Sequence, residues 1–426
     1  GKNKICNRKL EIRLSSTEVV VPEHWVTLMS YSKLHTASFG RENWCLQLQP
    51  LYNRGLLTSL SNGHIHLVDW CTGKTIHDFA AHSASISSLK VLNNEFTNSD
   101  LFASASEDSV KIFDVRTSSC VATLHNDKSA PFLSLDSRHD MLACGTELSG
   151  VDAELHIYDI KKLSEPLRSF VDSHHDDVTD IKFHPGDPGV LMSGSTDGYV
   201  NIYDLTNSDE EDALHQVINF ASIHSCGWLA PKRIYTLSHM ETFAIHELND
   251  KSDDLREPKP VEFGDVRQPW GCDYIVNVNP GFIAAGRSQE TQGELKLIAF
   301  NNEKVDTTNV LTIPQAHGDE IIRDVLIPDQ TTDMLYSCGE DGCLNIWKSQ
   351  TGSLNISRDF WDCSKRFNVF EDTVVEVDMD DTPNQDFTTD TELSISSEEK
   401  QKEKKKKKDK KHKKSKKKKS HRYKPY

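Results

Sequence analysis

The sequence predicts an all-β protein, a seven-bladed β-propeller followed by a charged, disordered C-terminal tail. Three observations support this prediction. A short strand-like motif recurs along the chain, a second apolar run precedes most copies of it, and the composition changes abruptly after about residue 362. Repeats with a period of about 40–45 residues are typical of propellers, in which each repeat forms one blade of a ring.

The recurring motif is a run of four or five residues in which side-chain character alternates, as in a β-strand. Four copies are evenly spaced, with their fourth residues at positions 68, 113, 158 and 203, and the later copies are spaced less regularly. We expect one copy in each of seven blades. The copies are Ile65–Asp69, Val110–Asp114, Leu155–Asp159, Val200–Asp204, Phe243–Glu247, Leu295–Ile298 and Leu344–Lys348.

A second apolar run lies upstream of most copies, for example Met334–Ser337. Turn residues such as Asp197-Gly198 and Asp341-Gly342 join the two runs, which predicts a hairpin. Further upstream, a histidine is followed four residues later by a branched apolar residue. These histidines are His82, His174 and His317.

This order of His, strand, Ser, Asp-Gly turn and Trp-Asp-like strand end resembles the WD40 repeat, over roughly residues 44–350. The resemblance implies a hydrogen-bonded tetrad that ties an outer loop to the inner hairpin of a blade. Blades five and six lack most of these markers, so their boundaries are the least defined. The two fullest tetrads are His317, Ser337, Asp341 and Trp347, and His174, Ser193, Asp197 and Tyr203.

We divide the chain into four parts by composition. Residues 18–36, which include Val19–Val21 and Trp25–Leu28, are expected to supply the outer strand of the last blade. That pairing would close the ring and remove its open sheet edges. The parts are an N-terminal segment (1–17), the propeller (18–362), an acidic disordered linker (363–399) and a lysine-rich tail (400–426).

The charge is divided unevenly between body and tail. Residues 400–426 hold 17 Lys and Arg against two acids, whereas the rest of the chain holds 32 basic and 63 acidic residues. Residues 371–399 are acidic and poor in apolar side chains, so we expect disorder there. The lysine block is interpreted as a nuclear or nucleolar localisation signal with nonspecific RNA affinity. A solubilising polycation is the alternative.

Cysteine use and hydropathy indicate the compartment. The ten cysteines include no CxxC pair, so we expect reduced thiols in the nucleus or the cytoplasm. No apolar run reaches the ~18 residues of a membrane-spanning helix, and no apolar segment of the secretory type follows the N-terminus. The propeller is expected to be a monomer.

The sequence contains no motif that predicts catalysis, a cofactor or a metal. GxSxG, P-loop, HExxH and GxGxxG patterns are absent. The run His174–Asp177 is the best local cluster of metal-ligand types, but the repeat explains His174 and a solvated loop explains the acids. His64 and His66 share one strand face and could form a pair, although a partly exposed strand face accounts for them as well.

Acidic loop residues are the best candidates for a binding surface. Within the family, the histidine loops and the Asp turns lie close together, and five acids there have no evident structural role. We interpret them as a docking face for a basic protein; a soluble acidic rim is the alternative. Trp228 and Trp270 are candidate aromatic anchors, and strand packing is the alternative for both. The five acids are Asp176, Asp177, Asp319, Glu320 and Glu340.

These features favour a non-catalytic scaffold or assembly factor in the nucleus, in particular the nucleolus. Its client would be a basic protein, a ribosomal protein or a histone, and its process ribosome biogenesis. The alternative is a substrate receptor of a cullin-type ubiquitin ligase, based on Asp114 and Arg116 in the run Phe113–Arg116, which resembles a Trp-Asp-x-Arg motif. A third alternative, an enzyme, has no supporting residue constellation.

Overall fold

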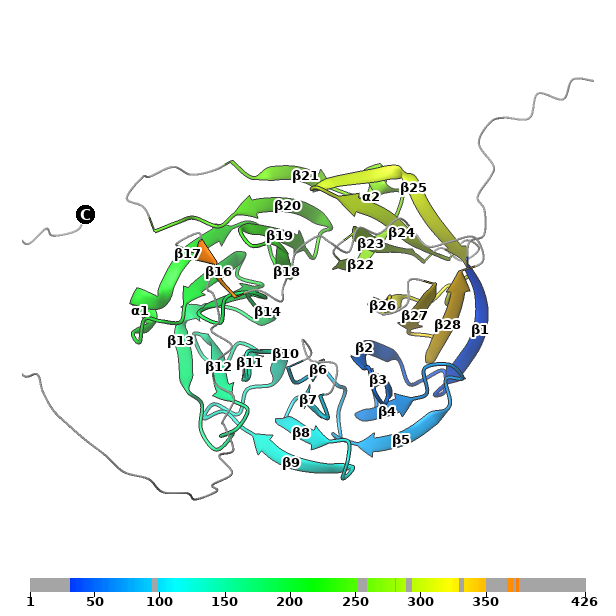
Figure 1. Ribbon diagram of the computed structural model, residues 1–426, viewed down its shortest axis with the longest axis horizontal. Helices are drawn as coiled ribbons and strands as arrows, with labels where there is room; N and C mark the ends of the chain where they lie inside the picture. Colours follow the sequence, from blue (N-terminus) through cyan, green and yellow to red (C-terminus); the bar gives the residue numbers. More distant parts are fainter. Residues whose placement is uncertain are drawn as a thin grey trace, which may run out of the picture. The chain divides into compact units, whose positions relative to one another are not determined.

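The computed structural model describes residues 31–93, 99–251, 259–279, 281–288, 293–328, 333–349, 366–370 and 373–374, all in the unit formed by residues 1–377. Within them, seven antiparallel sheets of four strands are arranged round a central axis (Figure 1). The predicted all-β, seven-bladed propeller is confirmed. The first strand of each blade borders the axis and the last strand forms the rim (Figure 1).

Blades 1 to 3 follow the chain in order, and each pairs its strands in sequence order. Blade 1 comprises β2 (Cys45–Leu51), β3 (Gly55–Leu60), β4 (His64–Val68) and β5 (Thr75–Ala80). Blade 2 comprises β6 (Ser88–Val91), β7 (Leu101–Ala105), β8 (Val110–Asp114) and β9 (Ser119–Leu124). Blade 3 comprises β10 (Phe132–Arg138), β11 (Met141–Thr146), β12 (Ala153–Asp159) and β13 (Arg168–His174).

Blades 4 to 6 repeat this pattern, with two four-residue helices, α1 (Glu210–Ala213) and α2 (Arg267–Trp270), in their connections. Blade 4 comprises β14 (Val178–Phe183), β15 (Val190–Ser195), β16 (Tyr199–Asp204) and β17 (Leu214–Asn219). Blade 5 comprises β18 (Ile223–Ala230), β19 (Arg233–Ser238), β20 (Thr242–Glu247) and β21 (Val261–Asp265). Blade 6 comprises β22 (Tyr274–Asn279), β23 (Gly281–Arg287), β24 (Glu294–Asn301) and β25 (Lys304–Pro314).

Blade 7 closes the ring by combining both ends of the propeller. Its inner strands are β26 (Ile322–Leu326), β27 (Met334–Gly339) and β28 (Cys343–Ser349), and its rim strand is β1 (Tyr31–Ser38). Pairing of β1 with β28 runs from Tyr31 opposite Ser349 to Ser38 opposite Cys343. The closing strand thus lies at the C-terminal end of the expected segment 18–36 and beyond it. Val19–Val21 and Trp25–Leu28 lie outside the described residues.

The hydrophobic core is a ring of seven clusters, each formed between two neighbouring blades. The middle strands of the blades are therefore covered on both faces, and β3 and β15 are buried at every residue. Rim strands have one covered face at most, and β9 is buried only at Leu124. Because each blade buries its faces only against its neighbours, closure of the ring is needed to cover the first and last blades.

Blades 5 and 6, which lack the tetrad markers, are joined by aromatic side chains. Phe243 of β20 packs edge-on against Trp270 of α2, with ring centroids 5.5 Å apart, and against Phe300 of β24 at 6.2 Å. Edge-to-face pairs at such distances are favourable beyond the area that they bury. Apolar contact thus replaces the polar tetrad at this junction.

Carboxylates on the inner strands link neighbouring blades round the axis. The Phe183 N–H donates to Asp136 at 2.7 Å, from blade 4 to blade 3, and the Cys226 N–H donates to Asp180 at 3.1 Å, from blade 5 to blade 4. A buried carboxylate is tolerated when hydrogen bonds satisfy it. These inner-strand acids are therefore structural, not part of the exposed acidic surface.

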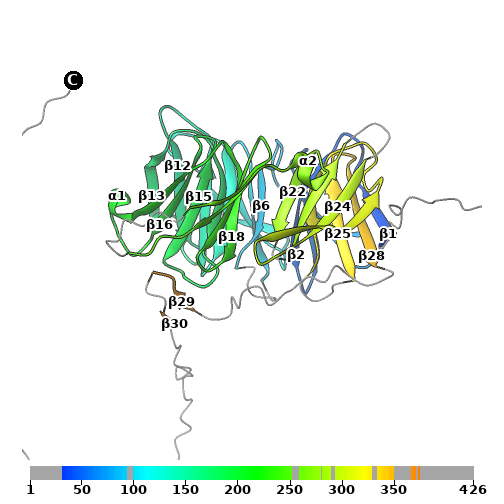
Figure 2. The ribbon, with the colours of Figure 1, turned by 90° about the horizontal axis from the view of Figure 1, so that it is seen from above.

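A short segment after the propeller docks on blades 4 and 5. The Phe367 N–H donates to the Gly186 carbonyl and the Val369 N–H to Asp187 Oδ2, both at 2.9 Å. Val369 is fully buried in the cluster between the two blades. Figure 2 shows the hairpin β29 (Phe367–Asn368) and β30 (Thr373–Val374) on the side of the sheets opposite α2. We name residues 366–370 the clip; they fall within the expected linker 363–399.

Candidate protein-interaction surface

The loops of the propeller form two faces. We define the upper face as the loops that connect each blade to the next, together with the loops between the second and third strands of each blade. Helix α2 belongs to it, and the clip lies on the opposite, lower face (Figure 2). The five acids expected to bind a partner all lie in upper-face loops: 175–177, 315–321 and 340–342.

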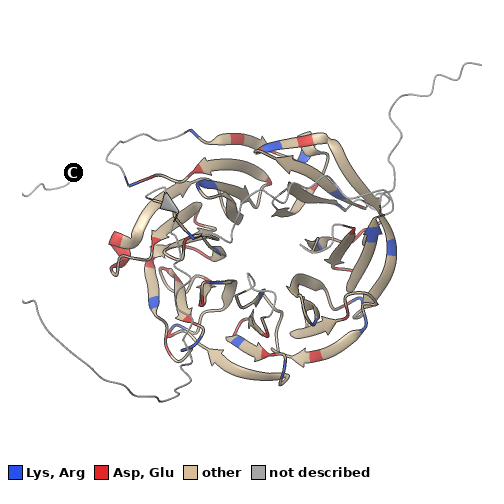
Figure 3. Ribbon diagram, viewed as in Figure 1, with Lys and Arg blue, Asp and Glu red and all other residues tan. Residues whose placement is uncertain are grey.

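The described loops of the upper face are strongly acidic. They hold fifteen Asp and Glu but only three Lys and Arg, namely Arg41, Lys128 and Arg267. Lower-face loops are more mixed, and charged residues occur all round the ring (Figure 3). The upper-face acids are Glu42, Glu107, Asp108, Asp127, Glu147, Asp152, Asp176, Asp177, Asp197, Glu241, Asp273, Asp319, Glu320, Glu340 and Asp341.

The five expected partner-binding acids differ in their surroundings. Asp177 accepts the Leu148 N–H at 2.8 Å, and Glu340 forms an ion pair with Arg323, with only 11% of the Glu340 side chain exposed. Asp176 is half-buried and accepts the Asp177 N–H. Asp319 and Glu320 are exposed, and no side-chain hydrogen bond joins either to another described residue. These two carboxylates are the most available to a partner.

The tetrad of blade 7 anchors the upper-face loop 315–321. His317 Nδ1 lies 2.9 Å from Asp341 and its Nε2 lies 2.7 Å from Ser337 Oγ. Trp347 Nε1–H donates to the same Ser337 oxygen at 2.9 Å. An ionised carboxylate can only accept, so Nδ1 of the imidazole carries the hydrogen that Asp341 receives. The network fixes the loop that carries Asp319 and Glu320.

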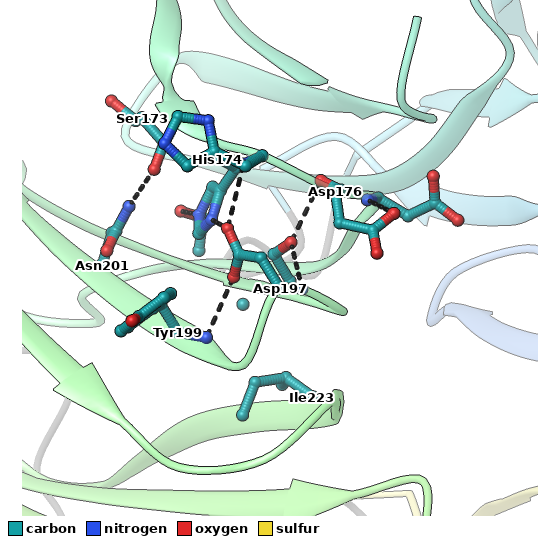
Figure 4. Close-up of polar contacts among 12 residues, drawn as sticks. Ser173, His174, Asp176, Asp197, Tyr199, Asn201 and Ile223 are labelled. Carbon is teal, nitrogen blue, oxygen red and sulfur yellow. Dashed lines mark hydrogen bonds and ion pairs between the residues drawn. The ribbon is translucent and has the colours of Figure 1, made fainter. Parts of the chain in front are cut away.

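The same arrangement recurs in blade 4, and Figure 4 shows the contact of His174 with Asp197. His174 lies 2.9 Å from Asp197 and 2.7 Å from Ser193, whose hydroxyl lies 3.3 Å from the Tyr203 hydroxyl. Burial opposes ionisation of Asp197, but hydrogen bonds from His174 and the backbone keep its pKa below the usual range. His174 ends β13 of blade 3, so this network also ties one blade to the next.

A third hydrogen-bonded network lies in blade 2. In the sequence, His82 is the one marker that we assign to it. His82 contacts Asp108 at 3.1 Å and Ser104 at 2.9 Å. Burial lowers the pKa of His82 and so favours the neutral imidazole. Phe113 stands where the other two networks have Trp347 and Tyr203, and it offers no polar atom.

The predicted tryptophan anchors are buried. Trp228 on β18 is 9% exposed and packs against His184, and Trp270 on α2 is 6% exposed in the core between blades 5 and 6. The structure instead exposes Trp44, at 43%, in the loop before β2, with the Arg323 guanidinium 5.8 Å from its ring centroid. Aromatic and arginine side chains dominate binding energy at many interfaces.

The loop 39–44 that presents Trp44 packs on the turn of blade 7. The Phe39 N–H donates to the Gly342 carbonyl at 2.9 Å. Gly342 has a φ of +72°, and a Cβ at this position would lie 2.0 Å from the Gly40 carbonyl oxygen, so only glycine fits. No sequence signal distinguished Trp44, because its loop lies outside the repeat pattern; the Asp341-Gly342 turn is the nearest marker.

The residues of the proposed ligase motif pair with each other. Arg116 binds the Asp114 carboxylate at 2.6 Å, while 60% of the Arg116 side chain is exposed on the lower face. Asp265 and Arg267, in a second Asp-Val-Arg sequence, pair at the same distance. A local Asp-x-Arg ion pair at a strand end therefore accounts for this geometry without a partner protein.

The residues of His174–Asp177, the run with the best local cluster of metal-ligand types, contact different partners and do not converge on one site. His174 belongs to the blade 4 network, whereas His175 Nδ1 lies 2.6 Å from Asp152. Among the described residues, the three metal-ligand side chains whose donor atoms come within 4.8 Å of one another are His64, His66 and Asp78. Neither four-residue helix in the described part of the chain has the length or apolar content to cross a bilayer.

Comparison with known proteins identifies the family. Residues 164–204 and 308–348 match the model of the WD domain, G-beta repeat, and each match contains one of the two predicted tetrads. An uncharacterized WD repeat-containing protein of Saccharomyces cerevisiae is 61% identical over 345 residues, which cover 81% of this chain and 89% of the relative. The chain is a member of the WD repeat-containing proteins.

Other relatives are less similar to this chain. The Dictyostelium discoideum homolog of WD repeat-containing protein 89 is 28% identical over 336 residues, 76% of this chain and 89% of the relative. Histone acetyltransferase type B subunit 2 of Candida glabrata is 30% identical over 138 residues, 32% of this chain and 31% of that one. A WD repeat propeller is the architecture of a protein-interaction scaffold, so the exposed loop faces are the candidate functional site.

Proposed function

We propose that this WD repeat propeller is a non-catalytic scaffold that holds a basic protein client on its acidic upper face. The observation that carries the proposal is the ratio of fifteen acids to three bases in the described upper-face loops. Complementary charge speeds encounter with a basic partner and disfavours acidic ones. The relative named as a histone acetyltransferase subunit supports a histone as one kind of basic client.

The site of contact is centred on the edge of blade 7. Exposed Asp319 and Glu320 supply charge, and Trp44 beside Arg323 supplies an aromatic contact. The ion pair of Glu340 with Arg323 holds the guanidinium at this edge. A lysine- or arginine-rich segment of the client fits this combination of charge and apolar surface.

The proposed place of action is the nucleus, in particular the nucleolus, and the proposed process is ribosome biogenesis with a ribosomal protein or histone as client. The lysine-rich tail, residues 400–426, supports this location by composition. Fluorescent fusions of the full chain and of a chain lacking residues 400–426 test it. Nuclear accumulation should depend on the tail, and an unchanged distribution would contradict the localisation proposal.

Binding of the client is tested with a charge-matched pair of variants. Asp319→Lys/Glu320→Lys reverses charge on the upper face, and Glu211→Lys/Glu262→Lys makes the same change at exposed positions away from it. We expect the first variant to weaken binding of a lysine-rich histone-tail peptide at least tenfold and the second less than threefold. Equal weakening would contradict the assignment of the face and indicate an effect of net charge alone.

Nuclease treatment separates the contribution of RNA from that of the propeller. We expect nonspecific RNA contact through the lysine tail to add salt-sensitive binding. Client association that survives nuclease and loss of residues 400–426 depends on the propeller. Association lost after either treatment would assign client binding to the tail or to RNA.

A further inference from the structure

Three side chains of metal-ligand type meet on the outer half of blade 1. His64 and His66 lie on β4, and Asp78 lies on the neighbouring strand β5. Their donor atoms are all within 4.8 Å of one another. His64 Nδ1 is 2.8 Å and His66 Nε2 is 3.6 Å from the same Asp78 oxygen.

The backbone places these residues together. Side chains two apart on a strand point to the same face, so His64 and His66 share one face of the sheet. The pairing of β4 with β5 sets Asp78 directly opposite His66 and thus on that face. The grouping therefore follows from strand register and does not depend on one rotamer.

The separations suit a tetrahedral cation. Zinc bonds of about 2.0–2.2 Å to nitrogen and oxygen place tetrahedral ligand atoms roughly 3.3–3.5 Å apart. The distances from the Asp78 oxygen to His64 Nδ1 and His66 Nε2, 2.8 and 3.6 Å, lie on either side of this value. All three ligand atoms lie within 4.8 Å of one another, so side-chain rotation would have to bring them to equal distances from a central ion.

His66 is a polar group that the described residues leave unsatisfied. Its Nδ1 is buried with no hydrogen-bond partner, and the 3.6 Å from Nε2 to Asp78 exceeds a hydrogen-bond length. Only 15% of the side chain is exposed, and Phe39 packs 4.6 Å from the ring. A metal binds the neutral imidazole, through the ring nitrogen that carries the lone pair.

We propose that His64, His66 and Asp78 form a zinc site on blade 1. Two imidazoles and one carboxylate suit a borderline transition metal, whereas magnesium and calcium need more oxygen ligands. The cation would bind His66 through Nε2, the nitrogen that faces Asp78. Three protein ligands leave a fourth coordination position for water or for a group of a partner. His64 and Asp78, 37% and 46% exposed, leave the site open to solvent.

The zinc site adjoins the upper face, but the proposal of a zinc site does not depend on the proposed binding of a basic client. The turn before β4 is bonded to both regions: Ser61 Oγ accepts the Trp44 N–H at 2.9 Å, and Asn62 accepts the His64 N–H at 3.1 Å. Zinc would therefore stiffen the turn that borders the Trp44 loop. Zinc binding is measurable on the isolated protein, so its failure and the failure of client binding are separate results.

The test uses the tag-free full chain, titrated calorimetrically with zinc chloride and, in parallel, with cobalt(II). Ligand variants are His64→Ala, His66→Gln and Asp78→Asn, and the control is His35→Ala, an exposed histidine of β1 outside the group. Circular dichroism establishes that each variant is folded.

We expect one zinc per chain with micromolar affinity, and a visible cobalt absorption of tetrahedral intensity. Each ligand variant should weaken binding at least tenfold, and His35→Ala should leave it unchanged. Zinc should raise the melting temperature of the parent protein but not that of Asp78→Asn. Absence of saturable binding below millimolar zinc, or binding that the ligand variants leave unchanged, would overturn the proposal.

Discussion

The Asp324 carboxylate accepts a hydrogen bond of 2.8 Å from the Leu48 N–H, although the two residues are 276 positions apart. Asp324 lies on β26 and Leu48 on β2, so the bond crosses the seam between the last blade and the first. Asn277 of blade 6 donates to the other Asp324 oxygen at 2.8 Å. One carboxylate thus links three consecutive blades at the point where the ring closes.

Stability should depend on the ionisation of Asp324. Burial raises its pKa to about 6, against about 3.9 in an unfolded chain. The folded state therefore binds the proton more tightly, and the stability that this supplies is present below pH ~4 and lost as the pH rises through ~6. Two pKa units correspond to about 3 kcal/mol.

Asp324→Asn tests this relationship because it removes the titration. The free energy of unfolding of the variant, relative to the parent, should increase by about 2 kcal/mol from pH 4 to pH 7, since at pH 4 the unfolded carboxyl is already half ionised. Urea denaturation at each pH measures it, and exposed Glu262→Gln controls for the loss of one carboxyl group. Parallel curves for the parent and Asp324→Asn would contradict the assignment.

The Ser337 hydroxyl should contribute more to the free energy of unfolding than Ser104, its counterpart in blade 2. Ser337→Ala leaves His317 and Trp347 without their shared partner and should cost about 2–3 kcal/mol. Ser104→Ala removes a partner of His82 alone and should cost about 1–2 kcal/mol. Chemical denaturation of both variants measures the two losses of stability. Equal losses would mean that the hydrogen bond from Trp347 to Ser337 does not contribute to stability.

The clip should detach without unfolding the propeller. Val369→Asp places a carboxylate in a fully buried position, at a cost of several kcal/mol that the few contacts of the clip cannot offset. We expect hydrogen exchange at residues 366–370 to become fast while exchange in β14–β20 is retained. Asn368→Asp, a half-buried neighbour, is the matched control. Retained protection of the clip in Val369→Asp would refute this prediction.

Trp44→Ala should weaken the basic client without destabilising the fold. Trp44 is 43% exposed, so its removal should change stability by less than about 0.5 kcal/mol. Loss of an aromatic contact chiefly raises the dissociation rate, and we expect at least a tenfold loss of affinity with an unchanged salt dependence. Surface plasmon resonance measures both, with exposed Ile76→Ala as control. Equal binding by Trp44→Ala and the parent would remove Trp44 from the site.

Several partner-binding residues were predicted from the sequence without knowledge of the side chains that surround them in the fold. Trp228 and Trp270 are of the residue type that often anchors an interface, but the packing of blades 5 and 6 buries both. Glu340 had no role in the repeat pattern, yet the fold places Arg323 beside it. Whether a residue of suitable type is exposed depends on neighbours that are distant in the chain. The periodicity of the sequence does not predict those neighbours.

The sequence by itself determined the number of blades, the family and the residues of two tetrads, because these depend on spacing within each repeat of about 45 residues. Only the tertiary structure decided which strand closes the ring, that Val369 docks under blades 4 and 5, and that Asp324 joins three blades. It also brought His64, His66 and Asp78 together through the register of two strands. Local spacing follows from the backbone geometry of a strand, whereas contacts between blades exist only once the ring has closed.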